Sequence, residues 1–230
     1  MRAYATNGSG TSYGNQVSFV AINPQPAYPL NSVFCESGPT LVIDVTNPTT
    51  GKTWMDRNLG AMQVAMSSTD VAAYGDLYQW GRGNDGHQCR NSATTTTLSS
   101  TDQPGNDLFI ISPNTPNDWR TVQNNLLWQG MNGINNPCPS GYRLPTETEF
   151  DAERLAWSAN TSIGALNSPL KISMAGYKYF GNVLSEGAFG NYWSSTVSGT
   201  SIRNLNFSTT GAGMSLAFRS YGMSVRCIKN

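Results

Sequence analysis

The sequence predicts an α+β fold in which short antiparallel strands outnumber helices, and three observations lead to this prediction. A single segment, Arg143–Trp157, has the pattern of a helix. Short segments rich in β-branched and aromatic residues precede and follow it, separated by turn-forming residues. Apolar residues make up 38% of the 230, which is enough for one sizeable core. We therefore expect one principal domain with a small appendage.

The appendage is predicted at the N-terminus, over residues 1–22. Two short strands flank the turn Asn7–Gly10, with alternation at residues 2–5 and 16–19. A two-stranded hairpin is only marginally stable by itself in water. We therefore expect this hairpin to pack against another part of the protein.

The principal domain is predicted to begin after a linker. Residues 23–39 form this linker, and three prolines near its start make it stiff and extended. The domain then covers residues 40–230. Its first elements are a strand at Thr40–Val45, a turn at Asn47–Gly51 and a partner strand at Lys52–Asp56.

Turn-forming residues dominate the long segment Gly81–Asn136, which shows no clear periodicity. A stretch of this length inside a Trp-rich domain is too long for an ordinary connection. We expect it to form ordered loops with a functional role.

The predicted helix begins with a capping box, because Glu149 follows Thr146 at the required spacing. It is expected to end near Ser158. Four residues are expected near one face of it: Phe150, Arg154, Leu155 and Trp157. Four acids near its start are explained by capping and solvation: Glu147, Glu149, Asp151 and Glu153. Strand-like segments follow the helix: Lys171–Ala175, Asn191–Thr196, Ile202–Phe207 and Met223–Ile228.

The charge balance excludes several classes of partner. Lys and Arg number 14 and Asp and Glu number 14, so the formal charge is zero and long-range attraction to nucleic acid or an anionic membrane has no source. No stretch approaches the roughly 18 consecutive apolar residues of a membrane span. Residues Met1–Tyr4 lack the apolar core of a signal peptide. We expect a soluble chain that binds no nucleic acid and does not insert into a membrane.

Four cysteines, Cys35, Cys89, Cys138 and Cys227, form no CxxC pair. With His87 as the single histidine, a zinc site would need nearly all of these residues from distant places. Two disulfides formed in an oxidising compartment fit the even count better. The four positions allow three connectivities.

Catalytic chemistry has few candidates here. His87 and Cys89 are near neighbours in a turn-rich segment, an arrangement in which the two side chains seldom face each other. The glycines of Gly81–Gly86 do not lie between a strand and a helix start, as a phosphate-binding loop requires. We therefore predict neither an enzyme nor a bound cofactor. Scattered aspartates leave a structural calcium ion in the loops open.

Four phrases, in order, carry a resemblance to a known family. They are Trp54-Met-Asp-Arg-Asn-Leu59, Cys138-Pro-Ser-Gly-Tyr-Arg-Leu-Pro-Thr-Glu-Thr-Glu-Phe150, Tyr192-Trp-Ser-Ser-Thr196 and Ser224-Val-Arg-Cys227. Together they resemble the Fibrobacter succinogenes major paralogous domain, a bacterial surface module with a C-type lectin-like fold. The resemblance covers about residues 40–230. It implies a Cys138–Cys227 disulfide that closes the ends of the fold, with Cys35–Cys89 as the second pair.

The N-terminal segment resembles the last two strands of a fibronectin type III-like domain of bacterial surface proteins. This resemblance implies that residues 1–22 are the remnant of such a domain in a longer protein.

Residues Tyr192–Cys227 resemble the variable region of proteins diversified by retroelements. In that family, adenine-directed mutagenesis rewrites chosen codons, and the rewritten side chains line one face of a lectin-like fold. The resemblance implies a recognition face over residues 198–221, with Trp193, Asn204, Met214 and Arg219 as scaffold. The positions expected to vary are Ser198, Ser201, Ser208, Gly211, Gly213, Ser215, Leu216, Ala217, Phe218 and Tyr221.

The composition of this segment supports a binding role. Large apolar side chains among glycine and serine are typical of a paratope, in which aromatics supply contact area and small residues supply adaptability. The alternative is that Met214, Leu216 and Phe218 alternate inward as the core of one more strand. The expected ligand is a protein or glycan on a cell surface. The expected location is extracellular, on a bacterial surface or a phage particle.

The family resemblance also allows other functions. Formylglycine-generating enzymes share the fold and a phrase similar to Arg143–Glu149, but they need a reactive cysteine pair near the C-terminus, where only Cys227 occurs. A structural or fimbrial surface module is the other alternative. Calcium-dependent sugar binding of the lectin type is not expected, because the phrase Tyr192–Ser195 lacks the usual acid.

Overall fold

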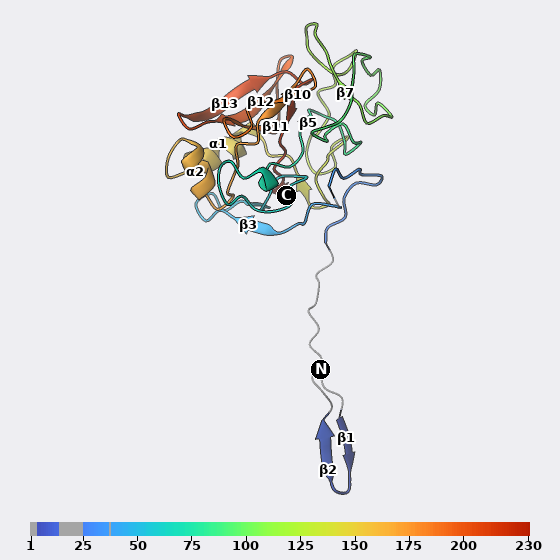
Figure 1. The fold of residues 1–230 in the computed structure, drawn as a ribbon, viewed down its shortest axis with the longest axis vertical. Coiled ribbons are helices and arrows are strands. Elements are labelled where there is room, and N and C mark those ends of the chain that lie inside the picture. The colour runs from blue at the N-terminus through green and yellow to red at the C-terminus, as the bar shows by residue number, and fades with distance from the viewer. Residues whose placement is uncertain (1–3, 14–24, 37) are drawn as a thin grey trace.

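The computed structural model describes residues 4–13, 25–36 and 38–230, and in these ranges it is rich in sheet and poor in helix (Figure 1). The helices are α1 (Glu147–Leu155), α2 (Ser162–Asn167) and a short 3₁₀ turn at Val71–Ala73. The strands are β1 (Tyr4–Asn7), β2 (Gly10–Tyr13), β3 (Asp44–Thr46), β4 (Thr53–Met55), β5 (Tyr78–Gln79), β6 (Thr94–Thr95), β7 (Phe109–Ile110), β8 (Tyr142–Arg143), β9 (Tyr177–Tyr179), β10 (Asn182–Leu184), β11 (Gly190–Ser198), β12 (Ser201–Phe207), β13 (Ala212–Ala217), β14 (Gly222–Met223) and β15 (Ile228–Lys229).

The N-terminal hairpin forms with a tighter register than the sequence predicts. Strands β1 and β2 pair directly around Asn7–Gly10, whereas the second strand was expected at residues 16–19, which lie outside the described residues. All eight strand residues are exposed, so none of them is packed against the described part of the principal domain. The expectation that the hairpin packs against another part is therefore not met by these residues.

The principal domain is closed by a four-stranded sheet in the order β3-β4-β15-β8. The predicted hairpin is confirmed, because β3 and β4 pair antiparallel around the turn at Asn47–Gly51. The first strand is shorter than expected and begins only at Asp44. At the far end of the chain, Ile228 of β15 pairs with Trp54 of β4, which joins the two ends of the domain.

Helix α1 begins as predicted, because the Thr146 hydroxyl accepts from the Glu149 amide and the Glu149 carboxylate accepts from the Thr146 amide. Burial opposes ionisation of Glu149, but the bonds from Arg143 and Thr146 outweigh it and lower its pKa to about 2. The helix ends earlier than expected, at Leu155, whose side chain is 68% exposed and not on the inner face. Glu153 is also not solvated as expected, because it is fully buried and accepts a hydrogen bond from Asn47.

Two segments after α1 differ from the prediction. Helix α2 was not expected, and Lys171–Ala175 is not a strand although most of it is buried. The backbone of this segment bonds to helix α2 and to a loop, and not to a neighbouring strand. The Ile172 amide donates to the Ala165 carbonyl, and the Met174 amide donates to the Ser68 carbonyl.

The C-terminal strands form a three-stranded antiparallel sheet in the order β11-β12-β13, shown in orange to red in Figure 1. Strands β11 and β12 confirm the predicted segments Asn191–Thr196 and Ile202–Phe207. A strand in the segment of β13 was only the alternative interpretation of the sequence. The expected strand Met223–Ile228 is divided into β14 and β15, because the backbone between them bonds to the loop around Leu59 and to β4.

Buried tryptophans organise the long loops. Trp80, Trp119, Trp128 and Trp193 are fully buried. Each indole donates to a backbone carbonyl, at Ser194, Trp80, Arg82 and Tyr78 respectively. These bonds fix segments that carry little regular structure, since Gly81–Asn136 contains only β6 and β7 as strands. The order in this region is therefore supplied by side chains.

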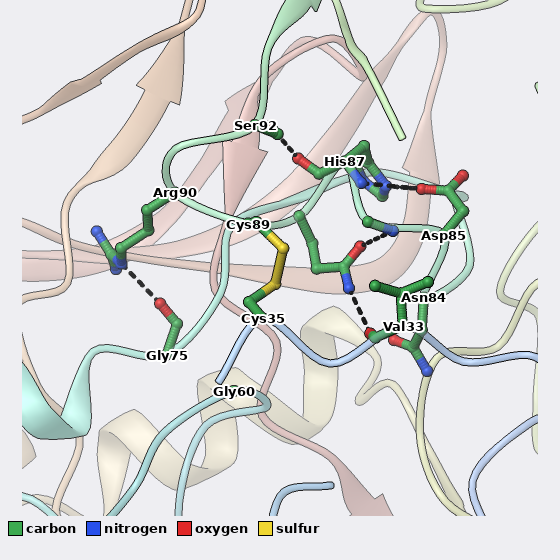
Figure 2. Close-up of a disulfide and its surroundings, with 12 residues drawn as sticks. Val33, Cys35, Gly60, Gly75, Asn84, Asp85, His87, Cys89, Arg90 and Ser92 are labelled. Carbon is green, nitrogen blue, oxygen red and sulfur yellow. Dashed lines mark hydrogen bonds and ion pairs between the residues drawn. A yellow bond between two sulfur atoms is a disulfide. The ribbon is translucent and has the colours of Figure 1, made fainter. Parts of the chain in front are cut away.

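Both expected disulfides are present. Cys138 pairs with Cys227 and Cys35 with Cys89, with Cα–Cα distances of 6.0 and 5.3 Å. Figure 2 shows the second bond, which ties the segment around Val33 to the loop that carries His87. Two disulfides indicate a protein that matures in an oxidising, extracellular or secretory environment. Within the described ranges, no helix has the length and apolarity needed to span a membrane.

The predicted effect of pH on stability centres on Asp76, which is 6% exposed. Burial raises its pKa from 3.8 to about 7, although Arg90 opposes the change. Unfolded Asp76 ionises near pH 4 while folded Asp76 holds its proton, so stability falls as pH rises from about 4 to about 7.

The variant Asp76→Asn cannot ionise. We expect it to be more stable than the parent by about 1–3 kcal/mol at about pH 8.5, with little difference near pH 4, in thermal denaturation at both values. An equal gain at both values would show that ionisation is not the cause.

Candidate functional site

The sheet β11-β12-β13 has two different faces, which follow from its register. On one face Tyr192, Leu205 and Phe207 pack with Phe150 and Trp157 in and after α1. The opposite face carries polar side chains toward one end. There Asn191 pairs with Asn206, and Asn204 pairs with Ser215. The sheet therefore holds a polar face firmly in place by burying the other.

Five aromatic rings lie beside this polar face, and we call them the aromatic cluster: Tyr177, Tyr179, Phe180, Phe218 and Tyr221. The centroid of the Tyr221 ring is 6.1 Å from that of Tyr177, 4.6 Å from that of Tyr179 and 5.8 Å from that of Phe218. The Tyr179 and Phe180 rings are in edge contact at 4.4 Å. Tyr179, Phe180 and Phe218 are each more than one-third exposed, so the cluster presents aromatic surface to solvent.

The hairpin β9–β10 positions two of these tyrosines through strand alternation. Lys178, between them, is fully buried, and its ammonium donates to the Ser92 hydroxyl at 2.7 Å. The same ammonium lies 4.7 Å from the centroid of the Phe109 ring. Because alternate residues of a strand point to opposite sides, anchoring Lys178 directs Tyr177 and Tyr179 to the other side of β9. There Tyr177 still packs against a core cluster, whereas Tyr179 is exposed.

Phe180 is held in an unusual backbone conformation at the tip of this hairpin. The two turn residues, Phe180 and Gly181, have φ values of 48° and 79°. Two positive φ angles are typical of the type I′ hairpin turn, where Asn-Gly is the preferred sequence. A bulky residue with positive φ is strained, and such strain is found preferentially at functional sites. At this turn the Phe180 side chain is 40% exposed.

Tyr221 reaches the cluster because β14 follows it directly. Gly222 pairs with both Lys178 and Gln79. A Cβ at Gly222 would lie 2.9 Å from both Lys178 Cβ and Phe109 Cε2, so only glycine allows this approach. Partial burial is the main reason that the pKa of Tyr221 rises to about 12, so its phenol stays neutral in the physiological range.

A pocket of about 260 Å³ opens between the aromatic cluster and the polar face of the sheet, and we call it the asparagine pocket. Tyr177, Tyr221 and Phe189 contribute aromatic surface to it. The sheet contributes the side of the pocket that carries amides and a hydroxyl, from Asn191, Asn204, Asn206 and Ser215.

Two amide groups in this pocket each have one buried atom without a hydrogen-bond partner. Asn204 is 2% exposed and its Oδ1 has no partner, and Asn191 is 6% exposed and its Nδ2 has none. The Asn191 Oδ1 accepts from Asn206 at 2.8 Å, which fixes that amide. An unsatisfied buried polar group costs about 1–3 kcal/mol, so a partner at this place would recover free energy.

A larger hollow of about 1120 Å³ lies between residues 27–33 and the long loops, and several of its polar groups are already paired. The Asp85 carboxylate bonds to Arg82 and His87. Asn84 bonds to Tyr78, Ser32 and the Pro137 carbonyl. None of the buried unpartnered atoms of the described chain belongs to a residue that lines this hollow. The asparagine pocket is therefore the stronger candidate for a ligand site.

The structure brings together some of the ten residues that the sequence marks as variable. Ser215, Leu216, Ala217 and Tyr221 line the asparagine pocket, and Phe218 contacts Tyr221. Leu216 is 53% exposed, which contradicts the alternative interpretation that it belongs to the core. Ala217 is buried.

The remaining variable positions do not join the cluster. Ser198 and Ser201 pair at the β11–β12 turn, while Ser208 and Gly211 form the β12–β13 turn. These two turns are separated by the length of β12, roughly 20 Å. Gly213 lies between them and pairs with Asn206. The ten positions therefore do not make one compact face.

Sequence reasoning missed much of the site. Tyr177, Tyr179, Phe180 and Phe189 were not named as candidates, and Asn204 was assigned to the scaffold alone. The alternation of Tyr177, Lys178 and Tyr179 before a Phe-Gly dipeptide was a possible hairpin signal. It was weak because Phe is unusual at such a turn.

The one histidine is committed to structure. His87 is fully buried, and its Nε2 accepts from the Gln79 amide. Its Nδ1 bonds to Asp85 (Figure 2). Burial, reinforced by Arg82, lowers the pKa of His87 to about 4 despite Asp85. Among the described residues, no group of three or more His, Cys, Asp or Glu side chains is arranged to hold a metal ion.

In comparisons with family models, curated proteins and solved structures, no match to this chain was found.

Proposed function

We propose that this chain is an extracellular ligand-binding protein whose recognition surface is the aromatic cluster together with the asparagine pocket. The observation that carries the proposal is the exposed aromatic cluster, to which strand β9, the strained turn after it and the loop between β13 and β14 contribute. Aromatic side chains dominate the energetics of protein recognition because they bury large areas at a low cost in conformational entropy. The ligand is a protein or a glycan on a cell surface.

The proposed scaffold is a C-type lectin-like domain of the Fibrobacter succinogenes major paralogous type, diversified by a retroelement. Its support is the set of sequence phrases together with two features of the structure. The Cys138–Cys227 bond and the β4–β15 pairing join the ends of the domain. Nine of the ten variable positions, all except Ala217, are exposed or half-buried. A template repeat and a reverse transcriptase gene beside the coding sequence would test the diversification directly.

The test of recognition uses the variants Tyr221→Ala and Phe218→Ala. The labelled full chain is applied to arrayed glycans and to a panel of intact bacterial cells, and the apparent Kd is measured for each surface that binds. Each substitution should weaken binding by about 5- to 150-fold, equivalent to about 1–3 kcal/mol, because it removes an aromatic anchor. The melting temperature should change little, since both side chains are partly exposed.

The matched controls are Leu155→Ala and Ile163→Ala, which remove exposed apolar side chains from α1 and α2. Both controls should bind like the parent. Binding that both aromatic variants retain would contradict the proposed surface. A chain that binds none of the surfaces would favour the alternative of a structural surface module.

A further inference from the structure

We propose that the asparagine pocket binds a single uncharged sugar ring and that it does so without a metal ion. This inference rests on the proposed function, for which it names the ligand class at one site. It follows from the two unpartnered amide atoms, from the lack of charged side chains among the described lining residues, and from the aromatic wall.

The unpartnered amides require a ligand that both donates and accepts hydrogen bonds. Asn204 Oδ1 needs a donor and Asn191 Nδ2 needs an acceptor. A hydroxyl group can serve in either role, so two hydroxyls of a sugar can satisfy both atoms. Both atoms have almost no surface accessible to solvent, so the amide side chains must shift toward the pocket before a ligand hydroxyl can reach them.

The described lining residues carry no charge, and this argues against an ionic ligand. The described residues that line the pocket include no Asp, Glu, Lys, Arg or His. A phosphate, sulfate or carboxylate would lack the Arg or Lys that usually binds it. Calcium needs six to eight oxygen ligands, usually including carboxylates, and the lining offers only amides, hydroxyls and backbone groups. The site is therefore suited to a neutral ligand bound directly by the protein.

The wall and the volume suit a ring. Tyr177 and Tyr221 stack on each other with an angle of 12° between their planes, and both line the pocket together with Phe189. Flat aromatic surface packs well against the C–H faces of a sugar, while the tyrosine hydroxyls remain at a wet edge. A volume of about 260 Å³ is below the roughly 300–1,000 Å³ of a drug-sized site, so it suits one ring. Further residues of a glycan would then extend over the aromatic cluster.

A primary carboxamide from a protein ligand is the competing occupant, because it also donates and accepts. It is much smaller than a sugar ring, and it would leave most of the aromatic wall without contact. It therefore serves as a comparison in the experiment.

The test is saturation-transfer NMR on the full chain in excess EDTA. The probes are glucose, galactose, mannose, fucose and N-acetylglucosamine, with glucuronic acid, sialic acid and acetamide as comparisons. We expect at least one neutral sugar to bind, and the charged sugars and acetamide not to bind. The variant Asn204→Ala should weaken that binding at least tenfold. Its melting temperature should be unchanged or higher, because it removes a buried group that has an unsatisfied oxygen. A purely structural asparagine would instead lower the melting temperature when replaced.

Two further variants keep the result interpretable. Ser215→Trp fills the pocket from an exposed position and should abolish sugar binding even if Asn204→Ala fails to fold. Asn132→Ala removes an exposed asparagine from the larger hollow and should leave the affinity within about twofold of the parent. If Asn132→Ala loses sugar binding and Ser215→Trp retains it, the sugar binds in the larger hollow and not in the asparagine pocket. That result would overturn the inference.

Other outcomes separate this inference from the proposed function. The inference is overturned if no neutral sugar binds, if acetamide binds in preference, or if EDTA abolishes binding and calcium restores it. If no sugar binds but Tyr221→Ala still abolishes attachment to cells, the proposed function stands without the sugar site. If a sugar binds in the pocket while attachment to cells is independent of Tyr221 and Phe218, the proposed recognition surface is wrong.

Discussion

Removing the Cys138–Cys227 disulfide, by replacing both cysteines with alanine, is expected to lower the free energy of unfolding by about 4–5 kcal/mol. The bond joins residues 89 apart in sequence. Without it, the unfolded chain regains the entropy that closing so long a loop removes. Both residues also belong to a core cluster, so the lost sulfur contacts add to the effect. For a domain of this size the expected loss is a large fraction of the total stability.

Urea denaturation monitored by tryptophan fluorescence measures this loss, after non-reducing peptide mapping has confirmed the connectivity. The matched comparison is the pair Cys35→Ala and Cys89→Ala, which opens a loop of 54 residues outside the core clusters. Loop entropy alone predicts a loss of about 4 kcal/mol for it, so the core bond should have the larger effect. An unchanged midpoint for the Cys138 and Cys227 variant would refute the prediction.

The parts of the fold that the sequence could predict are those in which neighbouring residues determine the structure. The Thr146 and Glu149 pair closes its own hydrogen bonds within one helical turn. Strand β11 alternates between the two core clusters through Tyr192 and Trp193, so both rings are buried. The disulfides followed from the family resemblance, because the even count of cysteines by itself left three connectivities.

The missed elements depend on distant partners. Strand β5 has two residues and pairs with β14, which lies more than 140 residues later in the chain. Two residues are too few to show any periodicity. In Lys171–Ala175 the apolar residues resembled a strand, but their backbone groups found partners in α2 and in the loop at Ser68. Neither outcome can be read from local pattern.

The candidate site was predicted only in its C-terminal half for the same reason. Phe218 and Tyr221 were found because they lie in one stretch with an unusual composition. Their partners Tyr177 and Tyr179 come from a hairpin some 40 residues earlier, and the pairing of Gly222 with Lys178 brings the two halves together. Asn204 was assigned to the scaffold because an asparagine within a strand gives no sign in sequence of being unpartnered.

The second large effect is expected from Trp193→Ala, which should lower the free energy of unfolding by about 3–5 kcal/mol. The Trp193 side chain is fully buried between the sheet and the loops. Its indole donates to the Tyr78 carbonyl at 2.7 Å, and that carbonyl belongs to β5. Alanine leaves a cavity and an unpaired buried carbonyl, and both destabilise the fold. The conservative variant Trp193→Phe keeps most of the volume and should lose less.

The contrast between Trp193 and Tyr221 separates scaffold from recognition surface. Tyr221→Ala should weaken binding with little change in melting temperature, whereas Trp193→Ala should lower the melting temperature by several degrees. Binding by the remaining folded Trp193→Ala should weaken less than binding by Tyr221→Ala, because Trp193 is absent from the lining of the asparagine pocket. Chemical denaturation and binding measured on the same preparations decide between the roles.

If Phe218→Ala and Tyr221→Ala unfold the domain as readily as Trp193→Ala does, the aromatic cluster is core. The binding surface would then have to be sought in the loops between Gly81 and Asn136.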